Sequence, residues 1–216
     1  MDYESLKTRQ RAERHAHHPN LVLRVHRALS WLKAAEQRAD DPDGRFIFLW
    51  IAFNAAYAED IDEQSRLPEQ ETYRSFLRKL IELDGKDRIA GLVWTEFSSS
   101  IRLLLDNKFV FQDFWSFHNG KVSEEDWQRR FATARKAAQR ALASHDTVTV
   151  LGVALARIYT LRNQLIHGGA TWNSSVNREQ IRDCTNLMAK LVPLVIEIML
   201  DNPSTSWGPA CYPRVE

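Results

Sequence analysis

The sequence predicts an all-α protein, and three observations lead to this prediction. Apolar residues recur at helical spacing along most of the chain, for example at Val22, Val25, Leu29 and Leu32. No stretch alternates apolar and polar residues for long enough to require a β-sheet, and no repeat of solenoid length is present. A chain of 216 residues suits one main core, since domains usually hold roughly 100–200 residues. We therefore expect one bundle of about six to eight helices.

The helices are expected in one central domain, residues 20–200, between a polar N-terminal arm (1–19) and a Pro-rich C-terminal tail (201–216). The first helix should run from Asn20 to the turn "ADDPDG", and the second, "RFIFLWIAFNAAYAED", is apolar on nearly all sides, as a central helix would be. Further helices are predicted over 69–83, 86–106, 124–143, 147–167 and 176–200, with a short helix or packed loop at the aromatic cluster 109–117. Ser123 should cap the 124–143 helix, and Pro193 should kink the last helix or start its final section.

Charge and cysteine content narrow the class of protein. With 29 basic and 28 acidic residues, the chain has too small a net charge to indicate a nucleic-acid or membrane partner. Any basic surface must therefore be local. Two cysteines make no disulfide framework and match no zinc spacing, and no signal peptide or bilayer-spanning run appears. We expect a cytoplasmic protein without a metal, a cofactor or a membrane partner. One candidate basic surface lies on the predicted 124–143 helix, namely Arg129, Arg130, Arg135, Lys136 and Arg140, although such a strip is more often a solvated face.

The segment "LRNQLIHGG", residues 161–169, carries the strongest functional pattern. An arginine followed by a histidine five to seven positions later occurs in four other places, so the spacing alone decides nothing. The other pairs are Arg9 with His15, Arg11 with His17, Arg11 with His18, and Arg140 with His145. His15, His17 and His18 also form a histidine cluster, which we expect to be solvated rather than metal-bound, since no carboxylate or cysteine ligand accompanies it.

The setting of Arg162 and His167 distinguishes them from the other pairs. At about 100° per residue, the apolar positions around Ile158 share one helix face, and His167 lies about 180° from Ile158. Tyr159, Asn163 and His167 follow one another at intervals of one turn, with Arg162 on the flank. Gly168 or Gly169 can then end the helix in the left-handed conformation. The polar groups therefore converge at the end of the helix.

A purely structural explanation covers the same residues. A histidine in the last turn complements the negative end of the helix dipole, and an arginine and an asparagine on a wet face need no function. One helix face also encloses no pocket, so a catalytic site here would need cover from a neighbouring helix or from a second copy of the chain.

The segment "IYTLRNQLIHGG" resembles the signature of HEPN domains, particularly the ApeA-like branch, in which an arginine, a polar residue and a histidine lie near the end of a helix. The segment "FIFLWIAFNAAYAED" is similar to the aromatic, asparagine-containing helix near the start of that branch. The resemblance covers residues 20–200, with no diagnostic motif between 60 and 145. It implies an all-α bundle that dimerises, with the arginine and histidine of both copies in a shared cleft. It also implies metal-independent endoribonuclease activity, frequently in toxin–antitoxin or antiviral systems, with an antitoxin or defence-system partner.

The residue types agree with that chemistry. His167 can accept the 2′-hydroxyl proton or protonate the leaving oxygen, and Arg162 can stabilise charge on the phosphate, so that cleavage leaves 2′,3′-cyclic phosphate ends. Asn163 can orient the imidazole or hold a phosphate oxygen, while Tyr159 is a weaker candidate for stacking a base. The resemblance suggests that Asn54 supports the site through a hydrogen bond, the alternative being a satisfied buried amide. The competing function is a non-catalytic HEPN-like module that binds RNA, a nucleotide or a protein partner.

Overall fold

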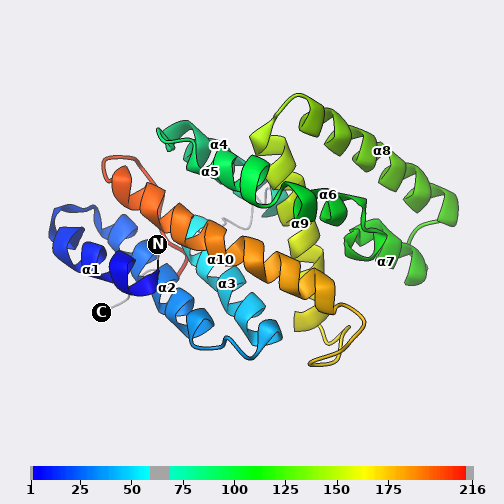
Figure 1. Ribbon diagram of the computed structural model, residues 1–216, viewed down its shortest axis with the longest axis horizontal. Helices are drawn as coiled ribbons and strands as arrows, with labels where there is room; N and C mark the ends of the chain where they lie inside the picture. Colours follow the sequence, from blue (N-terminus) through cyan, green and yellow to red (C-terminus); the bar gives the residue numbers. More distant parts are fainter. Residues whose placement is uncertain (1, 59–68, 213–216) are drawn as a thin grey trace. The chain divides into compact units, whose positions relative to one another are not determined.

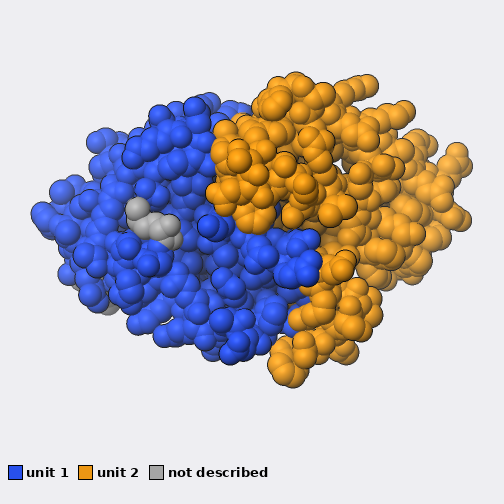
Figure 2. All heavy atoms as spheres, in the orientation of Figure 1, with its two compact units in different colours: residues 1–89, 181–216 blue, residues 90–180 orange. Residues whose placement is uncertain are grey.

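The computed structural model describes residues 2–58 and 69–212, with the backbone alone over 69–72. The described residues form ten α-helices and no strand, which confirms the all-α class. The helices gather into two compact units rather than around one core: residues 1–89 with 181–216, and residues 90–180. Figure 2 shows unit 1 in blue and unit 2 in orange. There are more helices than the six to eight expected, because the N-terminal segment is helical and one predicted long helix is interrupted.

Unit 1 is built on helices α2, α3 and α10. Helix α2 (Pro19–Glu36) packs along α3 (Pro42–Tyr57), and α10 (Arg178–Asp201), which belongs to unit 1 from Ile181 onward, lies across them (Figure 1). Helix α4 (Glu69–Leu83) packs beside α3. Helix α3 begins three residues before the predicted start, because Asp41 accepts a hydrogen bond from the backbone N–H of Gly44 at 3.1 Å and Pro42 suits the first turn. Helix α10 continues through Pro193, so this proline does not start a separate section.

The N-terminal segment is not the polar arm that we expected. Residues Tyr3–Glu13 form helix α1, followed by a 3₁₀ turn, η1, at Arg14–Ala16. Asp2 caps α1 by accepting from the backbone N–H of Ser5 at 3.0 Å. Leu6 is fully buried and Tyr3 nearly so, because α1 packs on α2. A sparse apolar stripe on a highly charged helix is therefore enough to attach it.

The C-terminal tail also packs into unit 1, as far as residue 212. The completely buried guanidinium of Arg24 donates to the backbone oxygens of Gly208 (3.3 Å) and Pro209 (2.7 Å) in the tail. It also donates to Ala56 and Ala58, at 2.9 Å each, at the end of α3. One arginine thus joins the tail to the end of the apolar helix.

A second arginine of unit 1 is held by carboxylates. Arg88 contacts Asp84 at 2.8 Å, Glu197 at 3.0 Å and Asp201 at 2.9 Å, and Asp201 also accepts from Arg9 at 2.7 Å. Desolvation raises the pKa of Asp201, but the hydrogen bonds from Arg9 and Arg88 outweigh it and hold this pKa below its usual range. The network therefore ties α1 and the 84–88 turn to the end of α10.

The predicted 86–106 helix starts in unit 1 and is interrupted just after residue 90, where unit 2 begins. Helix α5 (Arg88–Gly91) passes into a π-helical turn, η2 (Leu92–Glu96), in which the N–H of Phe97 donates to the Leu92 oxygen at 3.1 Å, and α6 (Ser98–Asp106) follows. Within the turn, Trp94 donates from Nε1 to the Thr147 hydroxyl at 2.9 Å. A helical apolar pattern continues through such a turn, so the sequence alone does not reveal it.

The rest of unit 2 consists of η3 (Lys108–Val110), α7 (Gln112–His118), α8 (Glu124–Ala143) and α9 (Thr147–Ile166). The predicted cap of α8 is confirmed, since the Ser123 hydroxyl accepts from the N–H of Asp126 at 3.1 Å. The aromatic cluster is partly core, with Phe114 buried, and partly surface, with Phe109 and Trp115 exposed. Among the residues that the structure describes, no helix is long and apolar enough to cross a membrane.

Candidate active site at the end of helix α9

Helix α9 presents an apolar face to the interior and a polar side at its C-terminal end. Asp146 caps its start by accepting from the N–H of Thr149 at 3.0 Å. The predicted apolar face is confirmed by five fully buried residues, namely Leu151, Ala154, Leu155, Ile158 and Leu161. The helix ends at Ile166, and the backbone N–H of His167 closes it on the Asn163 oxygen at 3.0 Å. The buried face therefore fixes which side chains remain on the polar side.

The two glycines behind His167 have different roles. Gly168 has φ +70°, which is the left-handed conformation predicted for the helix end and one that a side chain would strain. At Gly169 an added Cβ would lie 3.2 Å from the backbone oxygen of Gln164, so the chain returns close to the last helical turn. The pair of glycines thus makes a tight exit beside the histidine.

The structure brings Arg162, Asn163 and Tyr159 together. Arg162 donates from Nη1 to the amide oxygen of Asn163 at 2.9 Å, and its guanidinium carbon lies 5.5 Å from the centroid of the Tyr159 ring. All three side chains are half-buried. Because the Asn163 oxygen is engaged by Arg162, the group that Asn163 offers to a ligand is its NH₂, a donor suited to a phosphate oxygen or to an unprotonated imidazole nitrogen.

His167 lies at the same helix end but is exposed. Among the described residues its side chain has no hydrogen-bond or ion-pair partner. The side chain of Arg162, on the flank of the helix, contacts Asn163 and not His167. A single chain therefore presents an assembled Arg162–Asn163 pair with a solvent-accessible histidine one turn further on.

Asn54, the predicted supporting residue, is half-buried on α3. Its Oδ1 is buried without a hydrogen-bond partner among the described residues. A buried amide oxygen usually has a partner, and the described residues supply none for this atom. The predicted hydrogen bond from Asn54 to the Arg162–His167 helix would join different units, and it stays a prediction.

Two features beside the site were not apparent from the sequence. Gln164 donates from Nε2 to the backbone oxygen of Phe109 at 2.7 Å, which attaches the end of α9 to η3. The segment around His167 also exposes three large apolar side chains, Ile166, Trp172 and Val176. No local signal predicts the Gln164 contact, because its partner lies 55 residues away; the exposed tryptophan could have been suspected from the polar, turn-rich "GGATWNSS" around it.

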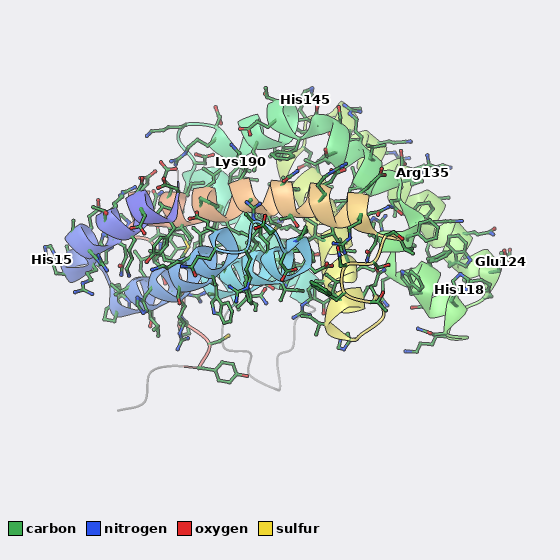
Figure 3. The ribbon with its side chains drawn as sticks, turned by 60° about the horizontal axis from the view of Figure 1, so that its bottom comes forward. His15, His118, Glu124, Arg135, His145 and Lys190 are labelled. Carbon is green, nitrogen blue, oxygen red and sulfur yellow. The ribbon has the colours of Figure 1, made fainter. Side chains whose placement is uncertain are left out.

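The basic strip on α8 is largely neutralised. Arg129 contacts Asp126 at 2.5 Å, and Arg135 contacts Asp106 at 2.6 Å. Arg130 lies 3.3 Å from Asp113. Three of the five basic residues thus face carboxylates, which favours the solvated-face interpretation over an RNA track. Figure 3 shows Arg135 on the outside of α8.

The histidine cluster near the N-terminus has local structural contacts. His18 caps α2 by accepting at Nδ1 from the N–H of Asn20 at 3.2 Å, and His17 Nε2 lies 3.9 Å from Glu13 Oε2. His15 is exposed in η1. Within residues 2–58 and 69–212, no three histidine, cysteine or acidic side chains form a group that could hold a metal ion.

Fold and site together define an all-α protein with an arginine, an asparagine and a histidine at the open end of one helix. Comparison of the chain with protein-family models, with curated proteins and with solved structures finds no match.

Proposed function

We propose that the chain is a metal-independent endoribonuclease of the HEPN type, active as a homodimer in which the α9 ends of two copies share one cleft. One observation carries the proposal: Tyr159, Asn163 and His167 succeed one another on the polar side of α9, and Arg162 is hydrogen-bonded to Asn163 at 2.9 Å. A toxin–antitoxin or antiviral setting, with a corresponding protein partner, belongs to the same proposal.

The proposed reaction needs one base, one acid and one cation. His167 of one copy takes the 2′-hydroxyl proton, and O2′ then attacks the adjacent phosphorus. The bond from phosphorus to the 5′-oxygen breaks, and that oxygen receives a proton from the second copy's histidine. The products are a 2′,3′-cyclic phosphate and a 5′-hydroxyl. Arg162 and the Asn163 NH₂ group donate to the phosphate oxygens, where negative charge develops.

The second copy is part of the proposal because of the exposure of His167. A histidine and an arginine in open solvent neither exclude water nor enclose a substrate. A second α9 end would bring a second histidine and cover the first, and the exposed Ile166 supplies apolar surface beside it.

The test is cleavage of single-stranded RNA in EDTA. We expect 2′,3′-cyclic phosphate ends, and we expect His167→Ala to lower kcat about 100-fold or more. The matched control is His118→Ala, because His118 is also exposed at a helix end, followed by Gly120 with φ +70°, but has no arginine one to two turns before it. An equal loss in both variants would assign the effect to helix ends rather than to catalysis.

Two other outcomes separate the competing functions. RNA binding without turnover would support the non-catalytic module and overturn the enzyme proposal.

The Arg162→Lys variant tests the role of the cation, since lysine keeps the charge but loses the planar donor fork. We expect this variant to retain less than a tenth of the activity, with a larger fall in kcat than rise in KM.

A further inference from the structure

We propose that unit 1 carries a separate RNA-backbone-binding surface, formed by basic residues of α1, η1 and the middle of α2. This inference rests on the proposed function for the choice of RNA as the polyanion. We call the surface the α1–α2 cluster, and it consists of Lys7, Arg11, Arg14 and His26. Arg27 lies beside it and adds charge, but its guanidinium already donates to the backbone oxygens of Cys211 and Tyr212, at 2.5 and 2.6 Å.

The cluster is assembled by the packing of α1 on α2. Lys7, Arg11 and Arg14 are spaced at i, i+4 and i+7, which places them on one side of the helical segment. Across the helix pair, Lys7 Nζ lies 3.4 Å from Nδ1 of His26. Arg11, Arg14 and His26 are exposed, so the side chains are accessible to a ligand in the monomer. Figure 3 shows His15, the residue after Arg14, at the outer end of this helical segment.

The charges act on one another. Burial, followed by the charges of Arg11 and Arg14, lowers the pKa of Lys7. Burial likewise lowers the pKa of His26, with further contributions from Lys7, Arg14 and Arg27. Each of these electrostatic effects comes from another cation, so the cluster is a region of mutual repulsion that an anion would relieve.

Within residues 2–58 and 69–212, no acidic side chain forms an ion pair with Lys7, Arg11, Arg14 or His26. Glu13 pairs with Arg9, at 2.9 Å, on another side of α1. Glu4 makes no ion pair within the described part of the chain, and neither do Arg11 and Arg14. This distinguishes the cluster from the α8 strip, in which Arg129, Arg130 and Arg135 each face an aspartate.

An RNA backbone fits the cluster better than a membrane surface. A helix that lies on a membrane inserts an apolar face, whereas Leu6 and Leu21 are buried in unit 1 and Tyr3 nearly so. The surface that remains is cationic and polar. Phosphate binding by such a surface releases counterions, so affinity should fall steeply with salt.

The experiment uses the full-length His167→Ala protein, so that binding is measured without turnover. A fluorescein-labelled single-stranded RNA is titrated by anisotropy at several salt concentrations. We expect Arg11→Ala with Arg14→Ala to weaken binding about tenfold at low salt, and to reduce the salt slope by roughly 1.4, given about 0.7 per phosphate contact on single strands. The matched control is Arg129→Ala with Arg135→Ala, which removes two exposed arginines that already have carboxylate partners and should change affinity less than about twofold.

Unchanged RNA affinity in the Arg11/Arg14 variant would overturn the inference, and so would an equal loss in the control. Binding to a membrane surface is tested by sedimentation with phosphatidylserine vesicles. If the chain binds these vesicles in preference to RNA, the inference of an RNA-binding surface is also overturned. The two proposals fail separately. If cleavage depends on His167 but RNA binding does not depend on Arg11 and Arg14, the nuclease proposal stands and the RNA-binding surface is wrong. If RNA binding depends on Arg11 and Arg14 but the unmutated chain cleaves no RNA, the surface stands and the nuclease proposal is wrong.

Discussion

Among the described residues, each of the two units buries one arginine, and the two arginines are accommodated in opposite ways. Arg24 of unit 1 is fully buried and donates to four backbone oxygens, those of Ala56, Ala58, Gly208 and Pro209. Arg157 of unit 2 is 5% exposed, yet it makes no hydrogen bond or ion pair within the described residues. Its guanidinium carbon lies 4.4 Å from the ring centroid of Phe111 and 5.7 Å from that of Phe131.

The difference shows that burial of a charge does not by itself reveal its contribution. Arg24 donates to four backbone carbonyls from a fully buried position, so removing its side chain takes a donor from all four at once. Arg157 leaves its own Nε without a partner, and burial lowers its pKa to about 10, while the charge of Asp113 acts in the opposite direction. Aromatic faces attract a cation, but they replace lost hydration only in part. Arg24 should therefore stabilise its unit much more than Arg157 does.

The largest expected effect is the loss of Arg24. Arg24→Met keeps much of the apolar volume but removes every donor, and we expect the free energy of unfolding to fall by about 3–5 kcal/mol. Urea denaturation followed by circular dichroism measures the change. A loss below about 1 kcal/mol would mean that water satisfies the four carbonyls equally well, and the contrast with Arg157 would disappear.

The next effect is a loss of stability in acid, and it depends on Asp201, the carboxylate that Arg9 and Arg88 share. Because the pKa of Asp201 is lower in the folded chain than its ordinary value of 3.8, the stability that Asp201 contributes is complete above pH 3.8 and is lost as pH falls through the folded-state pKa. We expect Asp201→Asn to make the unfolding free energy less dependent on pH below about pH 4. The control is Asp40→Asn, which removes an exposed carboxylate without an ion pair among the described residues. This variant should show the same pH dependence of the unfolding free energy in acid as the unmutated chain.

A smaller effect measures the aromatic contact in unit 2 directly. A double-mutant cycle of Arg157→Met and Phe111→Leu should give a coupling energy of about 1 kcal/mol, the usual size of a partly desolvated cation–π pair. A coupling near zero would show that the 4.4 Å approach reflects packing alone.

The smallest effect is expected for Arg157→Met by itself. The substitution removes a poorly compensated charge and keeps an apolar side chain among the aromatic rings, so stability should stay within about 1 kcal/mol of the unmutated chain. Cleavage of RNA should persist, because Arg157 is not among the proposed catalytic residues of α9. A loss as large as that of Arg24→Met would reveal a partner for Arg157 in the assembled protein.

Local signals predicted most helices but not their grouping. The bounds predicted for residues 69–83 and 124–143 agree with α4 and α8, because caps and apolar periodicity are encoded within a few residues. Helix α1 was not predicted, since Tyr3 and Leu6 make too sparse an apolar stripe among charged residues. A single core was predicted, whereas the described chain forms two units, one of which joins residues 1–89 to residues 181–216. Which distant segments group together is not encoded in local patterns.

The candidate site shows the same division. By itself the sequence determined that α9 is a helix with a buried apolar face, that Asn163 and His167 share its polar side, and that a glycine ends it, because all three follow from helical geometry over a few turns. Only the tertiary structure decided that Gln164 anchors the end of α9 to Phe109, that Glu197 and Asp201 hold Arg88, and that the cations of α1 and α2 meet with no carboxylate paired to them in the described part of the chain. The physical reason is that charge pairing and desolvation depend on which distant side chains meet.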